Sequence, residues 1–269
     1  MNKKLIIIII ALLIMGSGFV FFVGKKINKM VRAGNPSSAH TLSDQARALE
    51  TKGSLWEAKI LYQKLVNDFP ESSEVADWQK KSEDINIKLL FSPVLTPNSV
   101  IYQIRPGDTL NKIAREHKTT MELIMKSNDL DDELIVPGRK LKVWNVPFNI
   151  LVDKSQNILL LKNNEEVVKS YIVSTGKNNC TPVGTFKIVN KLPHPTWFKA
   201  GAVVPPQSAQ NVLGTRWMGF DLSGYGIHGT TEPKELGKQV TQGCVRLSNA
   251  DVEELYSIVP VGTEVMVME

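Results

Sequence analysis

The spacing of apolar residues changes twice along this chain of 269 residues, and each change marks a different kind of structure. Between residues 40 and 92 the apolar residues recur at helical spacing, interrupted at Gly53 and Pro70. Residues 101–145 combine two short strand patterns with two short helical ones. From residue 148 to 269, short runs of Ile, Leu and Val alternate with turn residues, which is typical of β-hairpins. The sequence therefore predicts a multidomain chain.

Residues 1–33 are a separate segment that contains an uncharged apolar run, residues 5–23. A helix of this length would span roughly 28 Å, close to the hydrocarbon core of a bilayer. We expect a transmembrane helix here, and a cleaved signal peptide is the alternative. The segment also holds the excess of basic residues: without residues 1–32, 26 basic and 27 acidic residues remain. The body of the chain therefore lacks the positive charge of a nucleic-acid-binding protein.

Residues 40–92 are predicted to form an α-helical hairpin followed by a third helix, with a linker before them at Gly34–Ser38. The segment resembles one tetratricopeptide unit in the order of Ala46, Gly53, Ala58, Tyr62 and Phe69-Pro70. One such unit cannot bury its own apolar face. The sequence leaves two interpretations open, a spacer and a surface for a protein partner.

Residues 101–145 predict the order strand, helix, helix, strand, or βααβ. The turn Pro106-Gly107-Asp108 follows the first strand, and Thr109 can cap the helix after it. With Pro137-Gly138 before the last strand, this segment resembles the lysin motif (LysM) family, which binds glycans of peptidoglycan or chitin that contain N-acetylglucosamine. The resemblance implies glycan contacts at Gly107, Asp108 and Thr109. Turn and cap chemistry is the alternative for the last two.

The segment 148–269 places one histidine and one cysteine among glycines, in Gly226-Ile227-His228-Gly229 and Gln242-Gly243-Cys244. A nucleophilic thiol needs a base within hydrogen-bond reach and N–H groups directed at the developing oxyanion. We therefore predict that Cys244 is a nucleophile and His228 its base. An inert buried thiol is the alternative.

The surroundings of this pair suggest further roles. The N–H groups of Gly243 and Cys244 are candidate oxyanion donors. A charged His228 and Arg246 are both expected to lower the pKa of the thiol. Cys180 and His194 have no comparable neighbours in the sequence, and we interpret both as loop residues.

The chain has two cysteines, Cys180 and Cys244, and neither belongs to a Cys-x-x-Cys pair or a Cys/His cluster. No metal site and no cofactor is therefore expected. A disulfide between the two cysteines remains an alternative in an oxidising compartment.

Several ordered motifs in residues 148–269 resemble the catalytic domain of the L,D-transpeptidase (YkuD-like) family. They are TPVGTF at 181–186, LGTRW at 213–217, GIHGT at 226–230 and TQGCVRL at 241–247. The resemblance implies a mainly antiparallel β domain that acts on peptidoglycan and whose cysteine is acylated by carbapenems. Gln242 stands where many members have a second histidine, and His228 aligns with the family's base.

The resemblance also implies a mechanism. Cys244 attacks the carbonyl of the diamino acid's L-centre in a tetrapeptide stem, D-alanine leaves, and a thioester forms. An amine then gives a 3→3 cross-link, whereas water gives L,D-carboxypeptidase activity. The Gly229 carbonyl is expected to orient the imidazole, and Thr241 and Arg246 to contact substrate. A structural salt bridge is the alternative for Arg246.

Three other functions are compatible with parts of this pattern. A sortase also has an N-terminal anchor and the order His, Cys, Arg, but with a longer gap between His and Cys. A cell-wall cysteine peptidase has the reverse order of Cys and His. A non-catalytic glycan-binding scaffold would need neither residue. The expected location is the bacterial cell envelope, with the body outside the cytoplasm, although the basic residues after the apolar run favour the opposite orientation.

Overall fold

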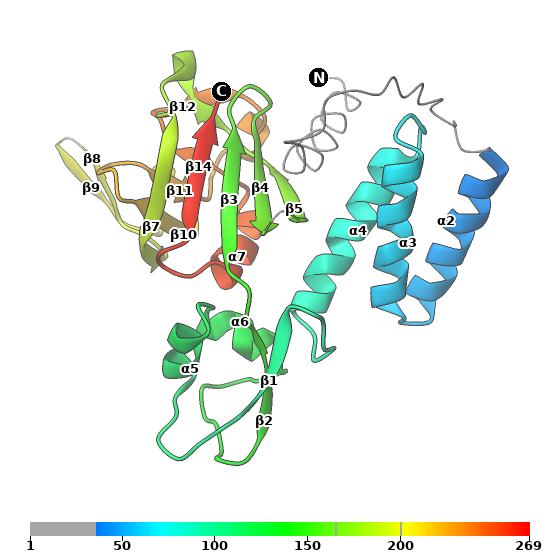
Figure 1. Ribbon diagram of the computed structural model, residues 1–269. Coiled ribbons are helices and arrows are strands. Elements are labelled where there is room, and N and C mark those ends of the chain that lie inside the picture. Colours follow the sequence, from blue (N-terminus) through cyan, green and yellow to red (C-terminus); the bar gives the residue numbers. More distant parts are fainter. Residues whose placement is uncertain (1–35, 165, 200) are drawn as a thin grey trace, which may run out of the picture. The chain divides into compact units, whose positions relative to one another are not determined.

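The computed structural model describes residues 36–164, 166–199 and 201–269 (Figure 1). The chain forms two compact units, and the boundary between them lies between residues 89 and 90. The expected membrane anchor at residues 5–23 lies outside the described residues. Among the residues that are described, none of the helices is both long and apolar enough to cross a bilayer.

Within its described residues, the first unit folds into three helices, α2 (Pro36–Thr51), α3 (Leu55–Asp68) and α4 (Val75–Leu90). The third helix buries the apolar face that the hairpin α2–α3 cannot bury alone, because Trp78 of α4 packs with Ala46 and Leu65 in one cluster. The Nε1 of Trp78 donates a hydrogen bond to Ser43 Oγ of α2 at 3.2 Å.

The predicted linker Gly34–Ser38 is wrong in its second half, because α2 begins at Pro36. Proline is favoured in the first turn of a helix, where its fixed φ fits and its missing N–H has no helical acceptor. The Pro-Ser-Ser sequence therefore starts a helix here.

The second unit begins with the predicted βααβ segment: β1 (Ser99–Gln103), α5 (Leu110–Glu116), α6 (Met121–Lys126) and β2 (Lys140–Trp144). The two strands pair antiparallel, with Ser99 opposite Trp144. Both short helices begin at a threonine cap: Thr109 Oγ1 accepts from the Lys112 N–H and Thr120 Oγ1 from the Leu123 N–H.

The rest of the unit is mainly β structure, as predicted. In the described part of the chain, eight strands form one sheet in the order β13-β11-β10-β7-β14-β3-β4-β5. Their bounds are β3 (Phe148–Asp153), β4 (Ile158–Asn163), β5 (Glu166–Ile172), β7 (Gly184–Pro193), β10 (Arg216–Phe220), β11 (Gly226–His228), β13 (Val245–Arg246) and β14 (Glu264–Met268). The small pairs are β6 (Thr175–Gly176) with β12 (Gln239–Thr241), and β8 (Trp197–Lys199) with β9 (Ala202–Val204).

The sheet is mixed, and its parallel pairs were not predicted. Strand β14 pairs parallel with β3, and β11 pairs parallel with β13. Parallel neighbours cannot be joined by a tight turn, so their partners are distant in sequence and leave no local signal. The first of these pairs brings the C-terminal strand next to the first strand of the domain.

Helix α7 (Asn249–Ile258) begins at a serine cap, where Ser248 Oγ accepts from the Asp251 N–H at 3.0 Å. The α6 and α7 helices lie side by side (Figure 1). Lys126 Nζ of α6 donates to Ser257 Oγ of α7 at 2.9 Å, and the Thr120 hydroxyl donates to the Ser257 carbonyl. These contacts attach the βααβ segment to the β domain.

A substitution in strand β4 tests whether the core of the β domain lies at that strand. Leu159 is fully buried and we expect Leu159→Ala to lower the free energy of unfolding of the β domain by about 2–5 kcal/mol. Native-state hydrogen exchange of the β3 and β4 amides would measure the loss. Ile172→Ala on edge strand β5, where the side chain is 57% exposed, is the control and should cost far less. Equal losses for the two variants would contradict this core.

Candidate active site

Strand pairing brings the predicted base and nucleophile together. His228 ends β11, and Cys244 directly precedes β13. The parallel register sets Ile227 opposite Val245 and His228 opposite Arg246. Cys244 lies in the bend just before β13, and its residue lines the same cavity as His228 and Arg246.

The two residues line one open cavity of about 720 Å³. This volume is within the range of small-molecule and peptide-fragment sites. His228 is buried, whereas Cys244 is partly exposed. Aromatic side chains from outside the two motifs complete the walls, namely those of Trp197, Phe198, Trp217 and Tyr225.

The orientation of the imidazole is fixed by the backbone. His228 Nδ1 lies 2.7 Å from the Gly229 carbonyl oxygen. A carbonyl can only accept, so in the neutral ring Nδ1 carries the hydrogen and Nε2 keeps its lone pair. Burial lowers the pKa of His228 to about 4, against the opposing effect of the Gly229 carbonyl. The ring is therefore neutral at pH 7 and suited to accept a proton.

The state of the thiol differs from the prediction. Burial raises the pKa of Cys244 to about 11, although Arg246 acts in the opposite direction. Cys244 Sγ donates a weak hydrogen bond to the Gly224 carbonyl at 3.5 Å. The expected lowering of the thiol pKa by a charged His228 fails because burial keeps the imidazole neutral. The resting pair is a thiol beside an imidazole.

The loop that carries Cys244 is held by Thr241. The Gly243 N–H donates to Thr241 Oγ1 at 3.1 Å, and the Thr241 hydroxyl donates to the Cys244 carbonyl at 2.7 Å. The Gly243 N–H is therefore occupied, which corrects its prediction as a free oxyanion donor. Among described residues, the Cys244 N–H has no acceptor.

Gly243 also satisfies a steric requirement. Its φ is +122°, and a Cβ at this position would lie 2.6 Å from Cε1 of Tyr225. Any other residue would displace either the ring that lines the cavity or the loop that carries the nucleophile.

The structure is compatible with both roles considered for Arg246, a structural salt bridge and a contact with substrate. Its NH1 donates to Glu232 Oε2 at 2.9 Å, which is a structural ion pair. Its buried Nε has no acceptor among the described residues, and the side chain lines the cavity. The ion pair thus uses one of the guanidinium N–H groups, and the Nε hydrogen is left without a partner among the described residues.

Asn249 was not assigned a role from the sequence. Its Oδ1 accepts from the backbone N–H groups of Thr215 and Thr230, and so fixes the segment that follows His228. A Cβ on Gly229 would lie 2.3 Å from this oxygen. The two N–H groups that Asn249 binds come from segments distant in the sequence, which leave no local signal.

Trp217 and Cys180 also belong to the surroundings of the site. The Trp217 ring stacks on His228, with centroids 6.0 Å apart. Cys180 lies in a loop, as predicted. The sequence did not reveal that this loop is close to the one that carries Cys244: the Cys180 carbonyl oxygen lies 3.5 Å from where a Cβ of Gly243 would be. Both cysteines are free thiols. His194 is an exposed loop residue.

In the βααβ segment, the three residues predicted to bind glycan serve the turn. Gly107 has a φ of +82°. Asp108 accepts from the Arg105 N–H, the Tyr102 hydroxyl and the Lys112 ammonium, and these bonds lower its pKa to about 2. Thr109 is the helix cap. Turn and cap chemistry accounts for their positions, and their contacts with glycan stay a prediction.

Comparisons with known proteins agree with this architecture. Residues 147–267 match the L,D-transpeptidase catalytic domain (YkuD), and residues 102–144 match the LysM domain. A Bacillus licheniformis protein assigned as L,D-transpeptidase YkuD is 34% identical over 177 residues, which are 62% of this chain and 98% of that protein. The Bacillus subtilis protein of the same assignment is 33% identical over 174 residues, 62% of this chain and 97% of that one.

Among solved structures, an L,D-transpeptidase from Mycobacterium smegmatis is similar to 50% of this chain and 65% of its own, with 22% sequence identity and a TM-score of 0.39. This chain belongs to the YkuD family of L,D-transpeptidases.

The raised thiol pKa predicts how alkylation depends on pH. We expect the rate of Cys244 alkylation by iodoacetamide to rise about tenfold per pH unit from 7 to 9, because the thiolate fraction grows in that proportion below the pKa. Peptide mass spectrometry would follow Cys244 separately from Cys180. A rate that levels off below pH 8 would show a thiolate already formed and would contradict the neutral resting pair.

Proposed function

We propose that the protein is a peptidoglycan L,D-transpeptidase with Cys244 as nucleophile and His228 as general base. One observation carries the proposal. The imidazole, with Nδ1 on the Gly229 carbonyl and the lone pair on Nε2, lines the same cavity as Cys244, which directly precedes the strand paired with that of His228. A non-catalytic scaffold has no need for this arrangement.

In the first half of the reaction, His228 Nε2 takes the thiol proton while Cys244 Sγ attacks the carbonyl carbon at the L-centre of the diamino acid. The C–N bond to the terminal D-alanine then breaks, and the imidazolium returns the proton to the leaving amine. The products of this half are D-alanine and a thioester on Cys244.

In the second half, an amine of a neighbouring stem attacks the thioester and gives its proton to His228. The thiol is regenerated and a 3→3 cross-link forms. Water in place of the amine gives a tripeptide stem, which is L,D-carboxypeptidase activity. The same acyl-enzyme thus serves both outcomes.

The electrostatics indicate when the proton moves. With an imidazole pKa of about 4 and a thiol pKa of about 11, a thiolate–imidazolium pair is unfavourable in the resting cavity. Proton transfer therefore accompanies the attack of sulfur on the carbonyl. The oxyanion that forms needs a donor, and the Cys244 N–H is available for it, whereas that of Gly243 would first have to leave Thr241.

Substrate binding follows from the charges and walls of the cavity. The buried Arg246 Nε is a donor for a carboxylate or carbonyl of the stem. The aromatic walls, including Trp197 and Tyr225, suit the aliphatic parts of the peptide. The stem lies in this cavity in our proposal, with its glycan strand outside.

The other segments position the enzyme. The LysM domain of residues 101–145 binds the glycan strand, and residues 5–23 anchor the chain in the membrane with the body on the outer, cell-wall side. Residues 40–92 serve as a spacer or contact a protein partner.

An intact-mass measurement of the protein from membranes tests the anchor, because cleavage would remove the apolar run.

A product assay tests the reaction. With a disaccharide-tetrapeptide, we expect release of D-alanine and cross-linked dimers, detected by mass spectrometry. Cys244→Ala should abolish both, and His228→Ala should lower kcat/KM at least 100-fold because proton transfer is lost. Cys180→Ala is the matched control and should retain activity. Product from Cys244→Ala would refute the nucleophile.

A carbapenem provides a second, substrate-independent test. We expect one covalent adduct on intact protein, mapped by proteolysis to Cys244, since the opened β-lactam acylates the thiol as the stem does. Cys180→Ala should leave the adduct unchanged. An adduct on Cys180, or none at all, would count against the assignment of the site.

A further inference from the structure

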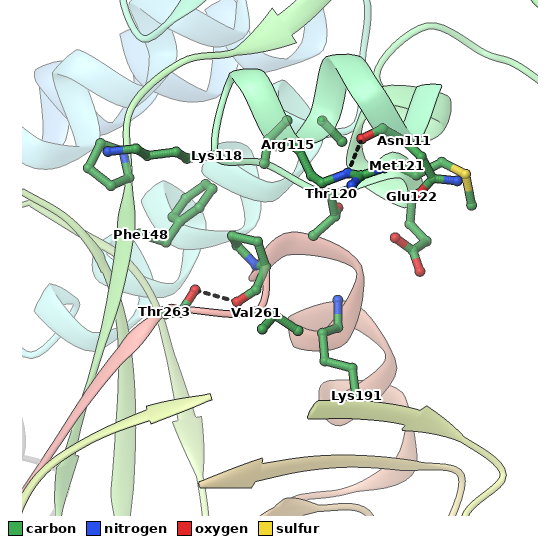
Figure 2. Close-up of a pocket in the computed structure, with 15 residues that line it drawn as sticks. Asn111, Arg115, Lys118, Thr120, Met121, Glu122, Phe148, Lys191, Val261 and Thr263 are labelled. Carbon is green, nitrogen blue, oxygen red and sulfur yellow. Dashed lines mark hydrogen bonds between the residues drawn. The ribbon is translucent and has the colours of Figure 1, made fainter. Parts of the chain in front are cut away.

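A second groove lies where the LysM domain meets the catalytic domain, separate from the cavity of Cys244. Its volume is about 580 Å³. The face of α5, the loop that follows it and the start of α6 form one wall, and β7 with the turn at residues 260–263 forms the other (Figure 2). The walls are joined by the hydrogen bonds of Thr120 and Lys126 to Ser257.

Positive charge dominates this groove. Arg115 and Lys118 come from the LysM side and Lys191 from the catalytic side, against one acid, Glu122. In the part of the chain that the structure describes, neither Arg115 nor Lys118 has a carboxylate partner. Arg115 Nε donates to the Asn111 carbonyl at 3.4 Å, which holds the guanidinium at the groove (Figure 2). Two cations are therefore available to an anion.

Glu122 and Lys191 point toward one another across the groove (Figure 2). Lys191 Nζ also donates to the Tyr256 carbonyl at 2.6 Å and lies over the Tyr256 ring. The groove thus presents a mixed-charge end at Glu122 and a purely cationic stretch at Arg115 and Lys118. A ligand that carries carboxylates and an amine matches this pattern better than a phosphate polymer, which Glu122 would repel.

Thr119 belongs to the lining of the same groove. The residue is only 4% exposed, and its hydroxyl, which is itself buried, has no hydrogen-bond partner among the described residues. Buried hydroxyls are nearly always satisfied, so this one is a candidate for a hydrogen bond with a bound peptide. Phe148, Met121 and Val261 add apolar surface beside it.

The groove and the catalytic cavity meet at one strand. Lys191 lines the groove and its neighbour Leu192 lines the cavity, from opposite faces of β7. A polymer with peptides at regular intervals could therefore occupy both sites with different stems.

We propose that this junction groove binds a second stem peptide of peptidoglycan, with its free carboxylates on Arg115 and Lys118 and its hydrogen bond on Thr119. The identity of the polymer rests on the proposed function, whereas the preference for a carboxylate-bearing peptide rests on the groove itself. The second stem would keep the polymer on the enzyme while the first reacts.

Methionine-methyl NMR on the full chain tests the groove, because Met121 lines it. The probe is the sugar-free tetrapeptide stem, added to the Cys244→Ala protein so that it is not consumed. We expect a saturable shift of the Met121 methyl. Arg115→Gln combined with Lys118→Gln should weaken the fitted affinity at least tenfold. The same peptide with its carboxylates amidated should leave Met121 unshifted.

The matched control is Lys52→Gln combined with Lys187→Gln, which removes the same charge from exposed sites outside the groove. It should change the affinity less than twofold. An unshifted Met121, equal weakening in the control, or a shift with inorganic phosphate but not with peptide would overturn the proposal. Carbapenem acylation of Cys244 in the otherwise unmutated chain, measured in parallel, separates the two proposals: an adduct without a Met121 shift refutes only the groove.

Discussion

The short parallel pairing of β11 with β13 is the constraint on which the site depends. It sets His228 opposite Arg246 and so brings Cys244, which directly precedes β13, to the same cavity as the imidazole. The base and the nucleophile are sixteen positions apart in the chain, and the pairing brings them together. The surrounding bonds serve this geometry. Asn249 fixes the segment after the histidine, and Thr241 closes the loop before the cysteine.

Burial sets the chemistry of the pair as firmly as position does. Removing both groups from water disfavours their charged forms, so the imidazole pKa falls and the thiol pKa rises. A thiol in this state resists oxidation and adventitious alkylation until a carbonyl is in place. In the proposed reaction, the thiol therefore stays protonated until a substrate carbonyl is in place. The nearby Arg246 opposes the rise in the thiol pKa without reversing it.

Much of this was predictable from local patterns. The βααβ order, the Thr109 cap and the hairpin-rich β domain follow from periodicity and turn residues, and the Gly-framed motifs identified His228 and Cys244. The missing features depend on partners that are distant in sequence. The parallel strand pairs, the Glu232 partner of Arg246 and the Cys180 carbonyl beside Gly243 leave no local signal. The prediction of a lowered pKa for Cys244 was wrong, because burial outweighs the effect of the neighbouring charge and sequence motifs do not report burial.

The account's central claim is that the sulfur and the imidazole act on the same bound stem. Rapid acid quenching during turnover of a tetrapeptide stem, followed by peptide mapping, tests it most directly. The account predicts a tripeptidyl thioester on Cys244 that forms within one turnover, and its formation slowed at least 100-fold in His228→Ala. A thioester that forms at the same rate without His228, or an acyl group on any other residue, would contradict the account.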